Sequence, residues 1–256
     1  MTADATRWLQ CARPKVDPAW RLVCFPHAGG SASFYRDWGE QLRGAEVHAV
    51  CYPGRAERID EPLPTDLRQM AGEIADAVEP LADRDLALFG HSMGAPIALE
   101  TARCLEARGV PLSHLFASGS RDAPVPPREP AAPDNDLEDG DVVIERLVRL
   151  GGTDAELAND PLFQELVLPY IIGDGRMFHA YVMSQQPLLR CPVTTVVGDV
   201  DHEADCRPWS ELTTGPFREE VVAGDHFYLV PAPPYSLLVE SMSAREESTA
   251  VQTERG

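Results

Sequence analysis

The pentapeptide Gly90-His91-Ser92-Met93-Gly94 contains the side chain best suited to nucleophilic chemistry. It matches the pattern G-x-S-x-G and lies between an apolar stretch, residues 86–89, and a run of helical character, residues 95–103. A sharp turn from strand to helix holds such a serine in a strained conformation, and the flanking glycines allow close backbone approach. The hydroxyl then lies beside a helix N-terminus, where negative charge is favoured. The pattern therefore predicts Ser92 as a nucleophile.

Two later segments supply an acid and a base. A β-branched run ends at Gly198 and leads into Asp199 and Asp201, and His226 follows a second strand-like run. Serine, then acid, then histidine is the chain order of the α/β-hydrolase triad, in which the acid orients the imidazole that accepts the serine proton. We predict His226 as the base and Asp201 as the acid, because this fold usually places the acid three residues past the glycine that ends the strand. Asp199 and Asp205 remain alternatives.

A glycine-rich turn offers hydrogen-bond donors for an oxyanion. The strand-like residues 21–25 open into Pro26-His27-Ala28-Gly29-Gly30-Ser31, which resembles the H-G-G-G-type loop that supplies one oxyanion amide. We predict that this amide belongs to Ala28, with Gly29 the next candidate. The second amide is expected from Met93, the residue after the nucleophile.

The elements that must position these residues alternate along the chain. We expect strands near residues 21–25, 46–51, 86–90, 114–118, 193–197 and 218–222, and helices at 33–42, 65–81, 94–108, 207–213 and 234–246. This order predicts an α/β-hydrolase fold, with a mainly parallel sheet and helices on both faces. At 256 residues and 44% hydrophobic, the chain is long enough for one domain, residues 1–256.

A long insertion interrupts this alternation at about residues 121–187. Its segments 142–150 and 161–172 are amphipathic, and we expect helices that cover the site as a lid; a contact with another domain or copy is the alternative. Gly173 and Gly175 flank Asp174 in this helical run and predict a soft point. The polar tail, about residues 244–256, is expected to be disordered.

Composition excludes several classes of protein. A net charge of −19 argues against binding to nucleic acid or to an anionic membrane surface. No signal peptide is recognisable, and no apolar run approaches 18 residues. Six cysteines without a C-x-x-C pair predict reduced thiols in a cytoplasmic protein. We expect a monomer. We also expect no metal site, since no cluster of histidine and cysteine with ligand spacing is found.

The chain resembles the type II thioesterases, the stand-alone editing hydrolases of polyketide and nonribosomal peptide assembly lines. The resemblance covers nearly the whole chain and rests on four segments: 25–32 (FPHAGGSA), 52–58 (YPGRAER), 90–95 (GHSMGA) and 224–227 (GDHF). It implies a triad of Ser92, Asp201 and His226, with oxyanion amides from Ala28 and Met93. The family's acid loop often reads Asp-Pro, whereas His202 follows Asp201 here.

The resemblance also implies a substrate and a partner. The substrate is an acyl thioester on the phosphopantetheine arm of an acyl or peptidyl carrier protein, and no cofactor is needed. The start at Met1, without a carrier segment ahead, favours stand-alone hydrolysis. Because carrier domains are typically acidic, as is this chain, recognition requires local arginines; the candidates are Arg55, Arg58, Arg128 and Arg176. The other functions to weigh are a general carboxylesterase or acyl-CoA thioesterase, and a non-catalytic binding protein of this fold.

Overall fold

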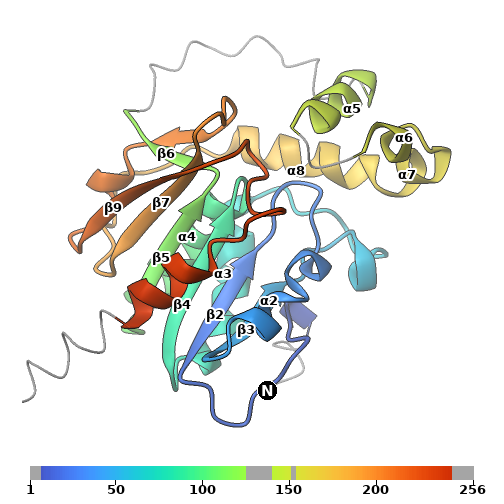
Figure 1. Ribbon diagram of the computed structural model, residues 1–256. Helices are drawn as coiled ribbons and strands as arrows, with labels where there is room; N and C mark the ends of the chain where they lie inside the picture. The colour runs from blue at the N-terminus through green and yellow to red at the C-terminus, as the bar shows by residue number, and fades with distance from the viewer. Residues whose placement is uncertain (1–6, 125–139, 151–153, 244–256) are drawn as a thin grey trace, which may run out of the picture.

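The computed structural model describes residues 7–124, 140–150 and 154–243. A seven-stranded sheet runs through the centre of the fold (Figure 1). Each neighbouring pair of strands is parallel except β1 and β3, which are antiparallel. The mainly parallel sheet expected from the sequence is thus confirmed. In spatial order the strands are β1 (Leu9–Gln10), β3 (Ala45–Val50), β2 (Trp20–Phe25), β4 (Asp85–His91), β5 (His114–Ser118), β7 (Val193–Gly198) and β9 (Phe217–Val222).

Alternating side chains of the strands supply an apolar core on each face of the sheet. In β4, Leu86 and Leu88 join the core that contains α3 and α4, whereas Ala87 and Phe89 join the core on the opposite face. Because both faces are covered, all four side chains are fully buried. The covering elements are η1 (Ala32–Tyr35), α2 (Trp38–Gln41), α3 (Leu67–Val78), η3 (Glu79–Leu81), α4 (Gly94–Ala107) and the helical residues 235–243.

One predicted helix is wrong. Residues 207–213 were expected to be helical, but β8 (Asp205–Arg207) pairs in parallel with β6 (Ser120–Asp122), and only the short turn η5 (Trp209–Glu211) follows. The main-chain groups of β8 are taken up by this second ladder, and the Ala123 amide donates to the Arg207 carbonyl at 2.8 Å. The expected helix 33–42 is also divided, into η1 and α2.

A helical segment lies across the carboxyl ends of the strands (Figure 1). The expected helix 161–172 is broken at Val167, because Pro169 has no amide hydrogen to continue the helical ladder and stands instead in the first turn of a new helix. That helix passes through both glycines, 173 and 175. The segment consists of α5 (Gly140–Arg149), α6 (Ala155–Ala158), α7 (Pro161–Leu166) and α8 (Leu168–Ala180). Residues 125–139 of the predicted insertion and the predicted tail lie outside the described residues.

Lys15, the only lysine in the sequence, ties the N-terminal segment to the turn before β3. Its ammonium group donates to the carbonyl oxygens of Leu42, Arg43 and Ala45 at 2.7, 2.9 and 2.5 Å. The half-buried side chain thus satisfies carbonyl groups near the end of α2. Within the part of the chain that the structure describes, no helix is both long and apolar enough to span a membrane.

Candidate active site

Ser92 stands in the turn between β4 and α4 with a positive φ of 54°. Its amide donates to the Ser118 carbonyl at 2.8 Å, which holds the turn against β5. A Cβ atom on Gly90 would lie 2.2 Å from the Gly94 carbonyl oxygen, and one on Gly94 only 2.1 Å from that of Phe25. Glycine is therefore required at both positions, and the backbone strain expected of a nucleophile turn is present.

His226 and Asp201 form a buried hydrogen-bonded pair. His226 Nδ1 lies 2.9 Å from Asp201 Oδ2, and the side chains are 6% and 0% exposed. The other Asp201 oxygen accepts the Glu203 amide at 2.9 Å. The two aspartates kept as alternatives have different partners: Asp199 accepts the Gly224 amide, and Asp205 bonds to Arg207. Of these three aspartates, the structure brings Asp201 to the imidazole.

A glycine contact brings the acid loop and the histidine loop together. A Cβ atom on Gly198, the last residue of β7, would lie 2.3 Å from the Gly224 carbonyl oxygen. The Asp201 amide donates back to the Gly198 carbonyl at 3.1 Å, which tightens the loop. The two loops follow the adjacent parallel strands β7 and β9, so their side chains meet at one edge of the sheet.

The glycine-rich turn after β2 begins beside the nucleophile, since the register pairs Phe25 with Gly90. The Gly29 amide donates to Asp174 Oδ2 at 2.9 Å and is therefore occupied. Among the described residues, the Ala28 amide has no hydrogen-bond partner. Ala28 and Met93 both line the cavity at Ser92. This arrangement separates the two candidates in the turn, because only Ala28 keeps its amide for a ligand.

The cavity above Ser92 has a volume of about 360 Å³ and is bounded by the helical segment. His226 lines it too, and the remaining wall is mainly apolar. A cavity of this size and lining suits an acyl chain. Its wall from the helical segment consists of Val143, Arg146, Leu147, Leu150, Leu157, Phe163, Val167, Tyr170, Ile171, Ile172, Gly175, Phe178 and His179.

Two further histidines lie beside His226, and sequence reasoning missed both. The His91 ring centroid is 5.1 Å from that of His226 and 5.9 Å from that of His27. Burial holds the pKa of His91 well below its usual 6.5, and desolvation lowers the pKa of His27 to about 3. Both rings therefore stay neutral at pH 7 and place no positive charge beside His226. The sequence signal for them was their position inside the two motifs, His27 in the glycine-rich turn and His91 next to Ser92.

The arginines expected at the surface are mostly not there. Arg55 and Arg58 are buried, with side-chain exposures of 2% and 7%. Arg176 is exposed on α8, and Arg128 lies outside the described residues. The cavity is lined instead by Arg146, which was not predicted; the arginines at positions 146 and 149 of the amphipathic segment were the signal. Arg58 pairs with Glu61 and stacks on Trp8, so it has a structural role.

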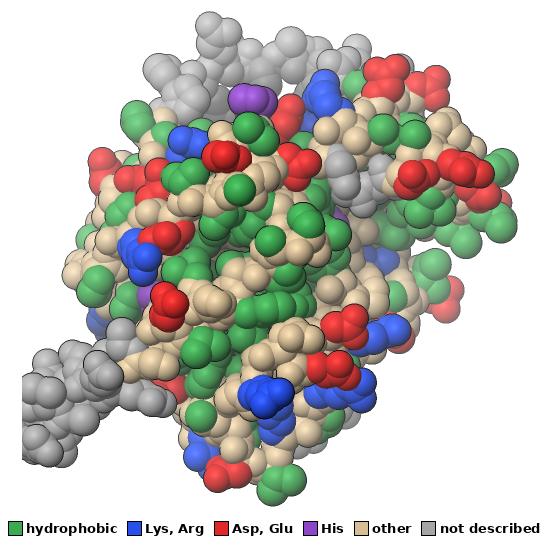
Figure 2. Space-filling view, viewed as in Figure 1, with side chains coloured by type: hydrophobic (Ala, Val, Ile, Leu, Met, Phe, Trp, Pro, Cys, Tyr) green, Lys and Arg blue, Asp and Glu red, His purple; other side chains and the backbone are tan. Residues whose placement is uncertain are grey.

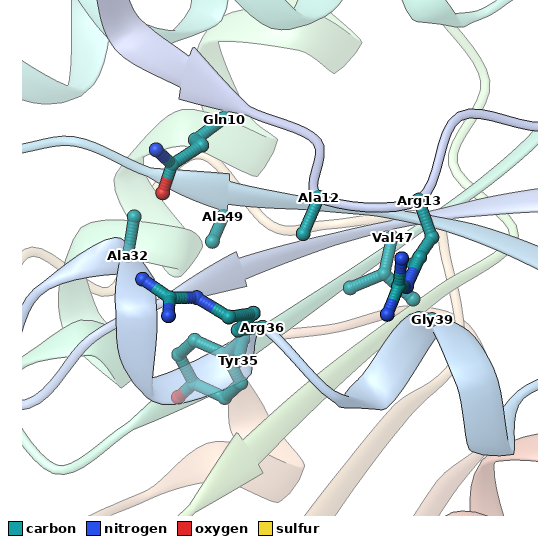
Figure 3. A pocket seen from close by; sticks show the side chains of 9 residues that line it. All are labelled: Gln10, Ala12, Arg13, Ala32, Tyr35, Arg36, Gly39, Val47 and Ala49. Carbon is teal, nitrogen blue, oxygen red and sulfur yellow. The ribbon is translucent and has the colours of Figure 1, made fainter.

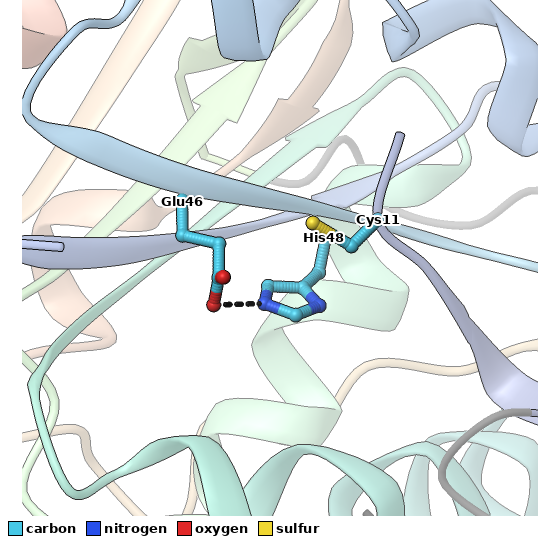
Figure 4. A group of neighbouring side chains, drawn as sticks. All are labelled: Cys11, Glu46 and His48. Carbon is cyan, nitrogen blue, oxygen red and sulfur yellow. Dashed lines mark hydrogen bonds and ion pairs between the residues drawn. The ribbon is translucent and has the colours of Figure 1, made fainter. Parts of the chain in front are cut away.

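Two of the other places in the described part of the chain that resemble sites can be set aside. Cys11, Glu46 and His48 bring potential metal ligands within 4.8 Å of one another (Figure 4). The Glu46 carboxylate, however, already binds the Lys15 amide, Arg21 and His48, each at 2.9 Å. Burial also raises the pKa of the Cys11 thiol, which disfavours the thiolate that a metal requires. Glu46 therefore belongs to a network of hydrogen bonds that includes its ion pair with Arg21.

The second is a cavity between the N-terminal segment, η1 and α2 (Figure 3). Its volume is about 10 Å³, at the lower limit of what a single water molecule needs. Arg13 and Arg36 border it, but no organic ligand fits a space of this size.

Comparisons with known proteins agree with this geometry. The family model described as "Thioesterase domain" matches residues 20–238. The "Probable cadicidin biosynthesis thioesterase" of Streptomyces griseus is 40% identical over 234 residues, which cover 89% of this chain and 64% of that relative. The chain therefore spans less than two thirds of that relative's length. "Thioesterase PikA5" of Streptomyces venezuelae is 37% identical over 235 residues, covering 90% of this chain and 82% of the relative.

A solved structure of similar fold is the type II thioesterase BorB from the borrelidin biosynthetic cluster. It superposes with a TM-score of 0.80 at 35% sequence identity, over 92% of this chain and 97% of that chain. The residues of this chain that the family model matches include Ala28, Ser92, Asp201 and His226. From the match to the family model and the two Streptomyces relatives, we conclude that this chain belongs to the thioesterase family.

Proposed function

We propose that this protein is a serine hydrolase that cleaves acyl thioesters from the phosphopantetheine arm of acyl or peptidyl carrier proteins. Its task is to remove stalled or aberrant acyl groups during polyketide or nonribosomal peptide synthesis. The observation that carries the proposal is the strained Ser92 and the buried His226–Asp201 pair at one end of a 360 Å³ apolar cavity. The names of the relatives and of the BorB structure support the biosynthetic setting.

The proposed reaction starts with attack of Ser92 Oγ on the thioester carbonyl while His226 Nε2 accepts the hydroxyl proton. The Ala28 and Met93 amides stabilise the oxyanion. Asp201 keeps the proton on His226 Nδ1 through the 2.9 Å hydrogen bond. A thiol of pKa about 8.5 is a good leaving group, so the carbon–sulfur bond breaks readily and His226 protonates the sulfur. Water, deprotonated by His226, then hydrolyses the acyl-Ser92 ester.

A partner contact is supported by an arginine and an apolar face beside the cavity. Arg146 lines the cavity and is about half exposed. Leu157, Leu162 and Leu166 on α6 and α7 are 53%, 65% and 52% exposed, and Figure 2 shows hydrophobic side chains gathered over these helices. Leu157 also lines the cavity. We propose that an acyl carrier domain approaches on this side, so that the arm enters next to α5.

The test of the proposal is hydrolysis of an acyl group on a carrier protein, combined with labelling by a fluorophosphonate. We expect Ser92→Ala to abolish both. Asp201→Asn should lower kcat about 10⁴-fold, because the imidazole loses its orienting partner. The matched control is Asp199→Asn, which alters the contact with the Gly224 amide but not the imidazole, and should keep kcat within a few-fold.

Three outcomes would each contradict a part of the proposal. If Asp199→Asn loses turnover while Asp201→Asn retains it, the acid is misassigned. If simple nitrophenyl esters are hydrolysed far faster than carrier-bound thioesters, the protein is a general carboxylesterase. Complete absence of fluorophosphonate labelling in the wild-type protein would indicate a non-catalytic binding protein.

A further inference from the structure

A buried ion pair lies against the cavity and is not part of the triad. Arg55, in the turn after β3, binds Asp174 of α8 through two hydrogen bonds of 2.6 and 2.5 Å. The two side chains are only 2% and 1% exposed. They are 119 positions apart in the sequence, so the pair joins two distant segments. The Arg55 guanidinium also lies over the ring of Tyr170, 4.7 Å from its centroid.

Such a pair needs an explanation other than stability. Removing two charges from water costs free energy that their attraction often does not recover, and apolar replacements are frequently as stable. The contacts beyond the pair itself give the explanation. Asp174 Oδ2 accepts the Gly29 amide at 2.9 Å, and Arg55 Nη1 donates to the Gly30 carbonyl at 3.1 Å. Both charged groups therefore bind the backbone of the same turn, at Gly29 and Gly30.

These contacts fix the peptide that follows Ala28. Gly29 has a φ of 77°, and a Cβ atom there would lie 2.8 Å from Ile171 Cγ1 of α8. The turn therefore packs closely against α8, and Asp174 binds the Gly29 amide. The carboxylate takes up the Gly29 amide, whereas the preceding amide, that of Ala28, has no partner among the described residues, and Ala28 lines the cavity. Oxyanion stabilisation depends on donors that are already in place before the charge develops.

We propose that the Arg55–Asp174 ion pair positions the Ala28 amide of the oxyanion hole and links its alignment to the seating of α8. This inference rests on the proposed hydrolase function. Asp174 supplies the acceptor that orients the turn, and Arg55 neutralises a carboxylate that would otherwise repel the developing oxyanion. Both are positioning residues, since neither is placed to touch the reacting atoms. Their loss is expected to affect kcat more than KM.

The test uses a variant that removes the pair without leaving a buried charge, Arg55→Met with Asp174→Leu. Two probes of equal chain length are compared: an alkyl trifluoromethyl ketone, which forms a charged hemiketal with the serine, and the corresponding secondary alcohol, which does not. We expect the ratio of their inhibition constants to shift about tenfold against the ketone, part of the 10²–10³ that a lost oxyanion donor costs. The value of kcat for an acyl thioester should fall by a similar factor, with KM little changed.

The matched control is another buried ion pair, Arg103 with Glu100 of α4, whose side chains are 4% and 9% exposed. Arg103→Met with Glu100→Leu should leave the ratio unchanged, whatever it does to stability. If the Arg55 and Asp174 double variant does not fold, Asp174→Asn carries the test. The side-chain amide oxygen of asparagine is a weaker acceptor for the Gly29 amide. The ratio of inhibition constants should therefore shift about two- to fivefold against the ketone.

A folded double variant, or Asp174→Asn in its place, with the wild-type ratio would overturn the inference. That result is distinct from failure of the proposed function. In the latter case the wild-type protein itself would not hydrolyse acyl thioesters, and the ketone would bind no better than the alcohol.

Discussion

At the scale of single residues, the surroundings of His226 are as informative as its hydrogen bond to Asp201. His91 is fully buried, and its Nδ1 lies 2.9 Å from the Ser118 hydroxyl, which in turn bonds to the Tyr228 hydroxyl at 2.7 Å. This chain of side chains holds a neutral imidazole beside the proposed base. The arrangement serves catalysis near neutral pH but makes the fold sensitive to acid, because an unfolded chain leaves the same imidazole free to bind a proton.

The acid sensitivity leads to a prediction. In the unfolded chain His91 binds a proton near pH 6.5, whereas burial lowers its pKa well below that value in the fold. Below pH 6.5 the unfolded state therefore binds more protons, and the free energy of unfolding falls as the pH falls. Each such histidine contributes a slope of about 1.4 kcal/mol per pH unit. His91→Met should reduce the slope by about that amount between about pH 6 and 5, as measured by urea denaturation.

The control for this experiment is His202→Gln, because His202 is exposed on the acid loop. Its slope should match that of the wild-type protein. Equal slopes for His91→Met and the wild-type protein would show that His91 does not titrate differently on unfolding.

The candidate site could be predicted at this scale only where its residues lie in local motifs. Ser92 is marked by the glycines on either side, and His226 by the glycine two positions earlier. The pairing of Arg55 with Asp174 could not be predicted, because nothing local connects two residues 119 positions apart. The arginine was instead expected at the surface, which is where an unpaired guanidinium is usually found.

At the scale of elements, the contacts of α8 show why one of its glycines, Gly173, is there. A Cβ atom on Gly173 would lie 2.8 Å from Leu63 Cδ1, and one on Gly54 would lie 2.2 Å from Leu63 Cδ2. Leu63 is thus wedged between two glycines of different segments. At Gly173 the helix is continuous and approaches Leu63 closely, beside the buried Asp174, and the soft point expected from the sequence stays a prediction.

A double-mutant cycle tests this account. Alanine is favoured over glycine in a helix interior by about 1 kcal/mol, but at position 173 this gain is opposed by displacement of Leu63. Gly173→Ala should therefore stabilise the protein by about 1 kcal/mol more in a Leu63→Ala background than in the wild-type one. Thermal or urea unfolding measures the coupling. Additive effects would mean that Leu63 moves aside freely and that the glycine has another purpose.

Elements were predictable where burial dictates the residue pattern. The central strands are buried on both faces, so their apolar, β-branched runs stand out. The helix expected at 207–213 failed because a ladder to a distant segment, β6, overrides local preference. The break at Val167 was overlooked although Pro169 marks it, since an amphipathic pattern continues across the proline.

At the scale of the whole molecule, the net charge of −19 makes the few positive groups near the cavity important. Arg146 and Arg149 of α5 both bond to Glu203, at 3.2 and 3.3 Å. α5 also carries Asp141 and Glu145, so the helix has no net positive charge, and its contribution at the cavity is the guanidinium group of Arg146. The Glu203 amide also donates to Asp201, which connects α5 to the acid loop.

The Arg146 guanidinium at the cavity predicts how substrates should rank. For one acyl group, kcat/KM should be highest on the carrier protein, lower on CoA and lowest on a short pantetheine mimic without phosphate. In Arg146→Gln, the advantage in kcat/KM of the carrier protein and of CoA over the pantetheine mimic should be about tenfold smaller. This is the effect of one lost charge-assisted hydrogen bond. The control is Arg84→Gln, an exposed arginine that pairs with Asp17 at 2.6 Å. Identical values on all three substrates would remove carrier recognition from the proposal.

The single lysine has a practical consequence for such measurements. Reagents that acylate amines, and enzymes that modify lysine, find one side chain in this sequence, and its ammonium is already bound to three carbonyl oxygens. Immobilisation or cross-linking through lysine would act on Lys15 only by disturbing the turn before β3. Thiol chemistry is the better handle, because Cys206 is exposed. A fluorophore at that position would lie on β8, close in sequence to the acid loop.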